Sequence, residues 1–142
     1  MSKEIKTIVT HKSPDLDSCV AIWILKNFVF KNSVFKYIFV DVGERIYHTN
    51  NCVHVDTGNI DYDHHDSNKM ISSASLVYST NNLNDPALKK IVDYTVLVDH
   101  GKTINDDTHF LNLSSALTGL LGTESERTLK AALVILDGIY NN

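Results

Sequence analysis

The amino-acid sequence predicts an α/β fold, namely a three-layer domain with a largely parallel central sheet and helices on both of its faces. The prediction rests first on short apolar runs, rich in β-branched residues, that alternate with segments of helical periodicity. It rests also on size, because 142 residues suit a single domain that spans residues 1–142. Apolar residues make up 43% of the chain, which is enough for one hydrophobic core.

The first half of the chain combines three expected strands with one helix. Residues 5–10 form the first strand, because they are mostly apolar and β-branched. Ser13 is the expected N-cap of the helix that follows, with Pro14 as its first residue. Residues 35–40 and 53–55 form the second and third strands, and each run ends at an aspartate.

Helices dominate the second half of the chain. Residues 73–80 predict a short helix, and Asp85 followed by Pro86 predicts the start of a longer one. Residues 123–126 fit a T-x-x-E capping box that opens a last helix, which ends at about Tyr140. Apolar residues cover most sides of this last helix, so we expect it to be deeply buried or shared with a partner.

The composition excludes several classes of function. Thirteen Lys and Arg against seventeen Asp and Glu give a net charge of −4, so no broad basic surface for nucleic acid is expected. The cysteines, Cys19 and Cys52, form no CxxC pair, and the first residues lack the apolar stretch of a signal peptide. The densest apolar run, residues 19–25, is too short to span a membrane. We therefore expect a cytoplasmic protein with no membrane partner.

Aspartates and histidines follow the apolar runs of the sequence. They are His11, Asp15, Asp17, Asp56, Asp63, His64, His65, Asp99 and His100. Ligands of parallel α/β sheets bind beyond the carboxyl ends of the strands, where most of these residues are expected. Carboxylates and imidazoles gathered there would hold two divalent cations, which is a known arrangement for phosphoryl displacement. Taken singly, an Asp-x-Asp at a helix start is usually a cap, and a His-His-Asp loop is usually solvated surface.

Short motifs in the same places resemble those of a known superfamily. Residues 11–17 (HKSPDLD) resemble the H-x-x-x-D-x-D motif of the DHH phosphoesterases, especially that of family II inorganic pyrophosphatases. Residues 63–65 match the DHH signature, and residues 98–101 resemble the fourth motif. Residues 55–65 and 71–78 resemble the melanocyte-proliferating-gene type of metal-dependent hydrolase, whose members include a 3′–5′ RNA exonuclease.

The resemblance implies a two-metal centre. The implied ligands are His11, Asp15 and Asp56 for one ion, and Asp17, Asp56, His64 and Asp99 for the other. His65 would then face the substrate as a catalytic residue, and Asp63 would orient the neighbouring imidazoles. Mn²⁺ is the implied metal, with Mg²⁺ or Co²⁺ as alternatives that the mixed ligand set also permits.

The expected function is metal-dependent hydrolysis of phosphodiester bonds in a nucleotide or nucleic acid. A phosphatase for a small substrate such as pyrophosphate is one alternative, and a non-catalytic nucleotide-sensing module is another. The sequence departs from the relatives it resembles, because Asp63 follows Asp56 by only seven positions and nothing after Asp107 resembles their second domain. We therefore expect a homodimer, with residues 126–140 at its interface, to help exclude water from the site.

Overall fold

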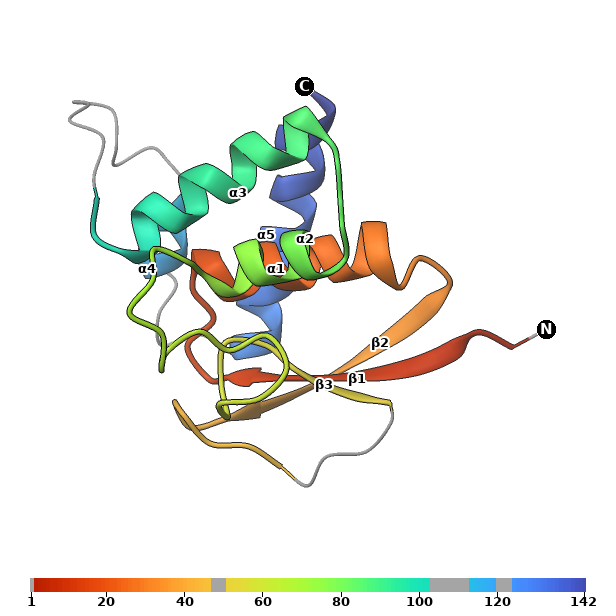
Figure 1. The fold of residues 1–142 in the computed structure, drawn as a ribbon. Helices are drawn as coiled ribbons and strands as arrows, with labels where there is room; N and C mark the ends of the chain where they lie inside the picture. The colour runs from red at the N-terminus through yellow and green to blue at the C-terminus, as the bar shows by residue number, and fades with distance from the viewer. Residues whose placement is uncertain (1, 47–50, 103–112, 120–123) are drawn as a thin grey trace.

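In the part of the chain that the structure describes, three parallel strands form a sheet (Figure 1). The computed structural model describes residues 2–46, 51–102, 113–119 and 124–142. Within these ranges the strands are β1 (Glu4–His11), β2 (Ser33–Val40) and β3 (Cys52–His54), in the order β2-β1-β3. The parallel register pairs Ile8 of β1 with Tyr37 on one side and with Val53 on the other. The central strand ends at His11, opposite Val40 of β2 and two residues beyond its last pair with β3.

Helices supply the remaining layers. They are α1 (Leu16–Ile24), the π-helical turn η1 (Leu25–Val29), α2 (Ser73–Thr80), α3 (Pro86–Asp99), α4 (Leu113–Gly119) and α5 (Ser125–Asn141). Figure 1 shows α1 and α2 over the sheet and α3 in the next layer away from it. The predicted three-layer α/β fold with a parallel sheet is confirmed.

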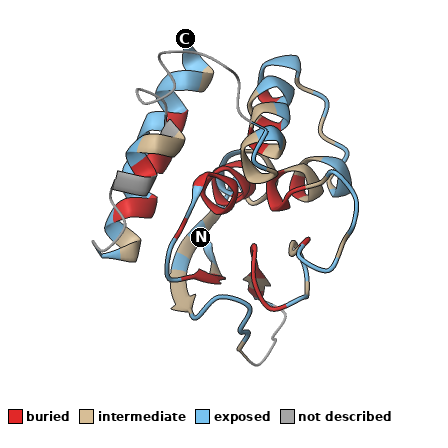
Figure 2. Cartoon of the chain, turned by 90° about the vertical axis from the view of Figure 1, so that its left-hand side faces the viewer, coloured by how far each residue is buried: buried red, intermediate tan, exposed pale blue. Residues whose placement is uncertain are grey.

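Helix α1 is the centre of the hydrophobic core. Every residue from Leu16 to Ile24 is buried, and Figure 2 shows buried residues on the sides of the helices and strands that face the centre of the molecule. It contacts α2, α3 and α5, and its polar first turn is buried together with its apolar remainder. Asp17 is therefore a buried carboxylate in the first turn of the central helix.

The helix starts confirm some predictions and correct others. Ser13 does not cap α1, because the Asp15 carboxylate accepts a hydrogen bond from the Ser18 backbone N–H (3.0 Å) and the two residues form a capping box. That reciprocal pair starts the helix at Leu16 rather than at Pro14. Asp85 caps α3 as predicted.

Helix α5 is amphipathic. Leu129, Leu133 and Leu136 are buried, whereas Val134 is 70% and Ile135 is 44% exposed. One side of the helix thus fills the core, and the other side is open in the single chain.

Two further findings concern the helices. Thr123, the expected cap of α5, lies outside the described residues, and Glu124 occupies the N-cap position without a side-chain hydrogen bond. Among the helices of the described ranges, none combines the length and apolar character needed to cross a membrane.

Candidate metal centre

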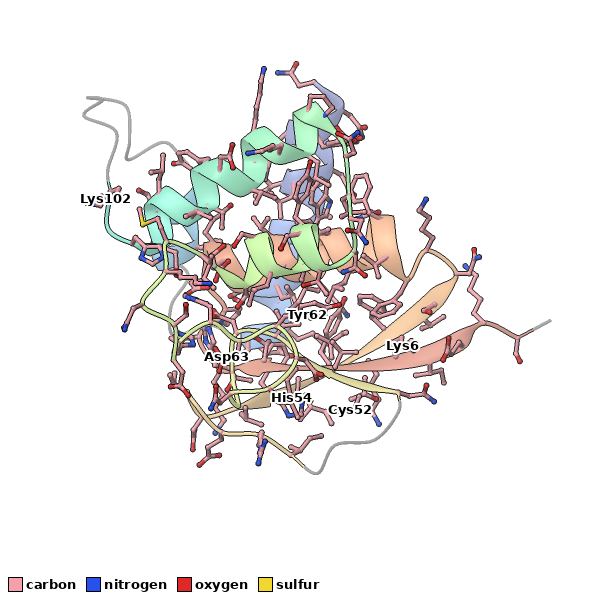
Figure 3. All side chains as sticks on the ribbon, in the orientation of Figure 1. Lys6, Cys52, His54, Tyr62, Asp63 and Lys102 are labelled. Atoms are coloured by element: carbon pink, nitrogen blue, oxygen red, sulfur yellow. The ribbon has the colours of Figure 1, made fainter. Side chains whose placement is uncertain are left out.

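The predicted ligands come from four different elements that converge at the carboxyl end of β1. His11 is the last residue of β1, Asp15 and Asp17 begin α1, and Asp99 ends α3. The loop after β3 supplies the others, and Figure 3 shows its labelled Asp63 beside the end of the sheet. We call His11, Asp15, Asp17, Asp56, His64 and Asp99 the site cluster. The structure brings all six together.

Asp56 lies at the middle of the site cluster and faces two histidines with its two oxygens. Oδ2 is 3.0 Å from Nε2 of His11, and Oδ1 is 3.4 Å from Nε2 of His64. The side chain is 2% exposed, so few contacts are left to water. One carboxylate therefore connects two groups of ligand atoms.

The backbone of Asp56 adopts a left-handed conformation, with φ of 59°. For a residue other than glycine this conformation is uncommon, although aspartate and asparagine adopt it more readily than most. Two backbone hydrogen bonds fix it, because Asp56 N–H donates to the Tyr62 carbonyl (3.1 Å) and Tyr62 N–H donates to the His54 carbonyl (3.2 Å). The strained backbone directs the carboxylate to the centre, which is a common property of functional residues.

The first group of candidate ligands consists of His11, Asp15 and Asp56. Each offers one ligand atom, and these atoms lie within 4.8 Å of one another. Asp15 serves two purposes with its two oxygens, since Oδ1 caps α1 through Ser18 and Oδ2 lies 4.0 Å from Nε2 of His11. The capping role that we expected for an isolated Asp-x-Asp thus leaves a ligand oxygen available.

The second group is arranged around Nε2 of His64. Oxygens of Asp17, Asp56 and Asp99 lie 3.3, 3.4 and 3.3 Å from it, yet no described residue is aligned to form a hydrogen bond with this buried nitrogen. Ligands that share one cation at about 2.0–2.1 Å are separated by roughly 3.0–3.4 Å. The spacing therefore fits ligands of a common cation better than it fits hydrogen bonds.

The first turn of α2 holds the two most buried carboxylates. The backbone N–H groups of Ser73 and Ala74 each donate to Asp17 at 2.9 Å, and the Ser73 hydroxyl donates to Oδ1 of Asp56 at 3.2 Å. Helix N-termini favour negative charge, and these contacts orient both carboxylates. Ser73 was not expected in the site from the sequence, although it follows Ser72, the N-cap of α2, and serine at a predicted helix start is a recognisable capping signal.

His65 differs from its neighbour in exposure. Its side chain is 53% exposed, compared with 9% for His64. The carboxylate of Asp63 contacts Nδ1 of His65 and also accepts a hydrogen bond from the Asn59 N–H at 2.7 Å. Nε2 of His65 lies 3.7 Å from Oδ1 of Asp56. The loop therefore positions one buried and one accessible imidazole side by side, with the rings stacked at 4.6 Å.

The pKa values in the site cluster reflect crowded charges. Burial raises the pKa of Asp56, but the contacts with His11 and His64 outweigh it and hold this pKa at about 2. The Asp17 and then the Asp56 carboxylate raise the pKa of His64 to about 10. Burial, followed by the charge of Asp17, raises the pKa of Asp99 to about 6. Imidazolium is thus the cation that balances the carboxylates when no metal is bound.

Comparison with known proteins identifies the family and corrects our assignment. A family model described as "ChrB, C-terminal domain" matches residues 8–142. No curated protein and no solved structure matches the chain. The resemblance to the DHH phosphoesterases is therefore wrong as a family assignment, because it rested on short motifs that specify local chemistry and not on most of the chain. The chain belongs to the family of the ChrB C-terminal domain.

Proposed function

We propose that this protein binds two divalent metal ions in the site cluster and uses them to hydrolyse a phosphodiester bond. The observation that supports this proposal most strongly is the position of Asp56, whose two oxygens face His11 and His64 separately. A shared carboxylate between two ligand groups is what a pair of neighbouring cations requires. Mn²⁺ suits the mixed imidazole and carboxylate ligands, with Mg²⁺ and Co²⁺ as the alternatives.

The surroundings of Nε2 of His64 also support the cation sites. Carboxylate oxygens of Asp17, Asp56 and Asp99 surround this buried nitrogen at 3.3–3.4 Å without forming an aligned hydrogen bond. A cation bound by His64, Asp17 and Asp99 would offset the repulsion among the carboxylates. Ions held by these residues would supply neutralisation of phosphate charge and a water molecule of lowered pKa.

We assign the catalytic contact with substrate to His65 and its orientation to Asp63. His65 is exposed enough to meet a substrate, and Asp63 fixes the ring through Nδ1, which leaves Nε2 directed toward the cluster. From there the imidazole can hydrogen-bond the scissile phosphate or donate a proton to the leaving oxygen.

The distribution of cationic side chains favours a phosphodiester over pyrophosphate. Among the described residues, no lysine or arginine forms an ion pair with the site cluster, and Lys12, the nearest in sequence, pairs with Asp41 at 2.9 Å. A phosphodiester carries a single negative charge, whereas pyrophosphate carries several that usually need such side chains. We therefore propose a nucleotide or nucleic-acid phosphodiester as the substrate class, and the cytoplasm as the compartment.

The test combines metal titration with a comparison of substrates. Calorimetric titration of chelator-treated protein with Mn²⁺ should give two ions per chain. The loaded protein should hydrolyse bis(p-nitrophenyl) phosphate faster than pyrophosphate, and chelator should remove the activity. Stoichiometry clearly below two contradicts the site. Two bound ions with faster pyrophosphate hydrolysis favour the small-substrate phosphatase, and two bound ions with no turnover favour a nucleotide-sensing module.

A further inference from the structure

His100 lies beside the second ligand group but belongs to neither set of expected ligands. Its imidazole, the side chain of His64 and the carboxylate of Asp99 offer ligand atoms within 4.8 Å of one another. The ring centroids of His64 and His100 are 6.2 Å apart. His100 follows α3 directly as its C-cap, so the end of the helix positions it together with Asp99.

A hydrogen bond to the backbone determines which nitrogen of His100 carries a proton. Nε2 lies 2.7 Å from the carbonyl oxygen of Ile71, and a carbonyl oxygen can only accept a hydrogen bond. Nε2 therefore donates, and in the neutral ring the lone pair is left on Nδ1. Histidines that bind metals commonly have this support, in which one nitrogen donates to a carbonyl and the other binds the ion.

We propose that His100 is a ligand of the second metal centre and that it gives this centre a stronger preference for Co²⁺ over Mn²⁺ than the first centre has. The inference rests on the proposed two-metal function. An independent observation points to a ligand in the same place, because Nε2 of His64 is buried without a hydrogen bond and lies 3.3 Å from Oδ2 of Asp99.

The difference between the two centres follows from their donor atoms. The first centre has one imidazole, from His11, and the carboxylates of Asp15 and Asp56. The second has two imidazoles when His100 is included. Carboxylates suit Mn²⁺ and Mg²⁺, whereas imidazole nitrogens favour later ions such as Co²⁺ and Zn²⁺. The second centre should therefore discriminate more strongly between Co²⁺ and Mn²⁺.

The proposal can be tested on the intact chain by titrating it with Co²⁺ and, separately, with Mn²⁺. Calorimetry measures the affinity of each ion. In the His100→Ala variant, we expect one of the two Co²⁺ sites to weaken by at least about 10–100-fold. The affinity for Mn²⁺ at that centre should fall by a smaller factor, because water readily replaces a nitrogen ligand of this ion. The other Co²⁺ site should not change.

Two more variants separate ligation from structural support. His100→Gln keeps an N–H donor for the Ile71 carbonyl but replaces the ligand nitrogen with an amide oxygen, so it should retain the fold and lose Co²⁺ affinity as His100→Ala does. Asp93→Ala changes an exposed residue on the same helix, whose ion pair with Lys89 lies away from the site cluster, and it should change neither affinity.

The outcomes distinguish this inference from the function on which it rests. Equal losses of Co²⁺ and Mn²⁺ affinity in His100→Ala, or no loss of either, overturn the role of His100 while two ions still bind. Wild-type protein that binds two Co²⁺ ions and hydrolyses no phosphodiester contradicts the proposed reaction only. Wild-type protein that binds no metal overturns both.

Discussion

The polar groups at the two ends of helix α1 differ in whether other protein groups satisfy their hydrogen bonds. At its start, Asp15 lies 4.0 Å from His11 and Asp17 lies 3.3 Å from His64 in the site cluster. Near its end, Trp23 donates from Nε1 to Oδ1 of Asp137 at 2.9 Å and makes edge-on ring contacts with Phe28 and Tyr140 at centroid distances of 5.6 and 5.5 Å. We call Trp23, Phe28 and Tyr140 the aromatic corner. Trp23 lies six residues beyond Asp17, so roughly 9 Å of one rigid helix separates the two regions.

The difference between the two regions separates a structural role from a ligand-binding role. In the aromatic corner the polar atoms are satisfied by the protein itself, since the indole donates to Asp137 and the Tyr140 hydroxyl donates to Asp85. In the site cluster, a buried imidazole nitrogen has no hydrogen bond in the described chain, and Asp56 has a strained backbone. The aromatic corner should therefore determine stability, and the site cluster should determine metal binding.

The largest expected effect is at Asp56. Asp56→Asn keeps a residue that tolerates the left-handed backbone, but it removes one of the two carboxylate oxygens that face the two centres. We expect metal stoichiometry measured by calorimetry with Mn²⁺ to fall from two ions to none. Asp66→Asn, an exposed change in the same loop, is the control and should still bind two. Retention of one tightly bound ion by Asp56→Asn would show that the carboxylate is not shared.

His65→Ala should separate catalysis from metal binding. The imidazole is exposed and is held by Asp63, so its removal should leave the metal content nearly intact. We expect kcat for the phosphodiester to fall by about 10²–10⁴-fold, as is typical when an acid or a charge-stabilising group is lost. If His65→Ala loses metal and His64→Ala keeps it, the roles of the two imidazoles are reversed.

The aromatic corner should show the opposite pattern. Trp23 is 1% exposed, and truncating a buried aromatic side chain typically costs about 3–5 kcal/mol. Trp23→Ala should therefore lower the free energy of unfolding in urea by about that amount, while the folded variant still binds two Mn²⁺ ions. Lys26→Ala, an exposed change just beyond the end of α1, should alter stability by less than about 0.5 kcal/mol. A loss of metal from folded Trp23→Ala would mean that the two regions are coupled.

Sequence reasoning predicted the positions of the site-cluster side chains more successfully than it predicted their support, and their role as metal ligands stays a prediction. His11, Asp56 and Asp99 were expected near one another because each follows an apolar run, and the structure places His11 against Asp56, with both Asp56 and Asp99 against His64. The contacts of Ser73 with Asp17 and Asp56 join residues more than fifteen positions apart, so periodicity along the chain could not reveal them. The start of α1 was also mispredicted, because Ser13 and Asp15 are both good caps and only the pairing with Ser18 decides between them.

Metal binding should release protons from the site cluster. The pKa of His64 is raised from 6.5 to about 10, so its protonation stabilises the metal-free protein fully below pH 6.5, and that contribution is lost as the pH rises through about 10. A ligand imidazole must be neutral, so each ion bound by His64 at pH 7 displaces a proton. Calorimetry in buffers of different ionisation enthalpy should yield at least about one proton, and the apparent affinity should increase with pH. Heats that do not depend on the buffer would contradict this charge state.

The smallest effect on the isolated chain is expected at the open side of α5, where the homodimer prediction can be tested. Ile135 is 44% exposed and Val134 is 70% exposed, whereas Leu133 and Leu136 of the same helix are buried in the core. Ile135→Arg should therefore leave the circular dichroism spectrum unchanged and cost the folded monomer less than about 0.5 kcal/mol, as exposed substitutions do. In a dimer joined through residues 126–140, however, the same change would bury one arginine from each protomer, and an unpaired buried charge is costly. Light scattering should then show a dimer for the wild-type protein and a folded monomer for Ile135→Arg.

Wild-type protein that is monomeric at micromolar concentration contradicts the dimer. The exposed apolar side chains would then be ordinary surface, since folded monomers commonly expose some apolar area.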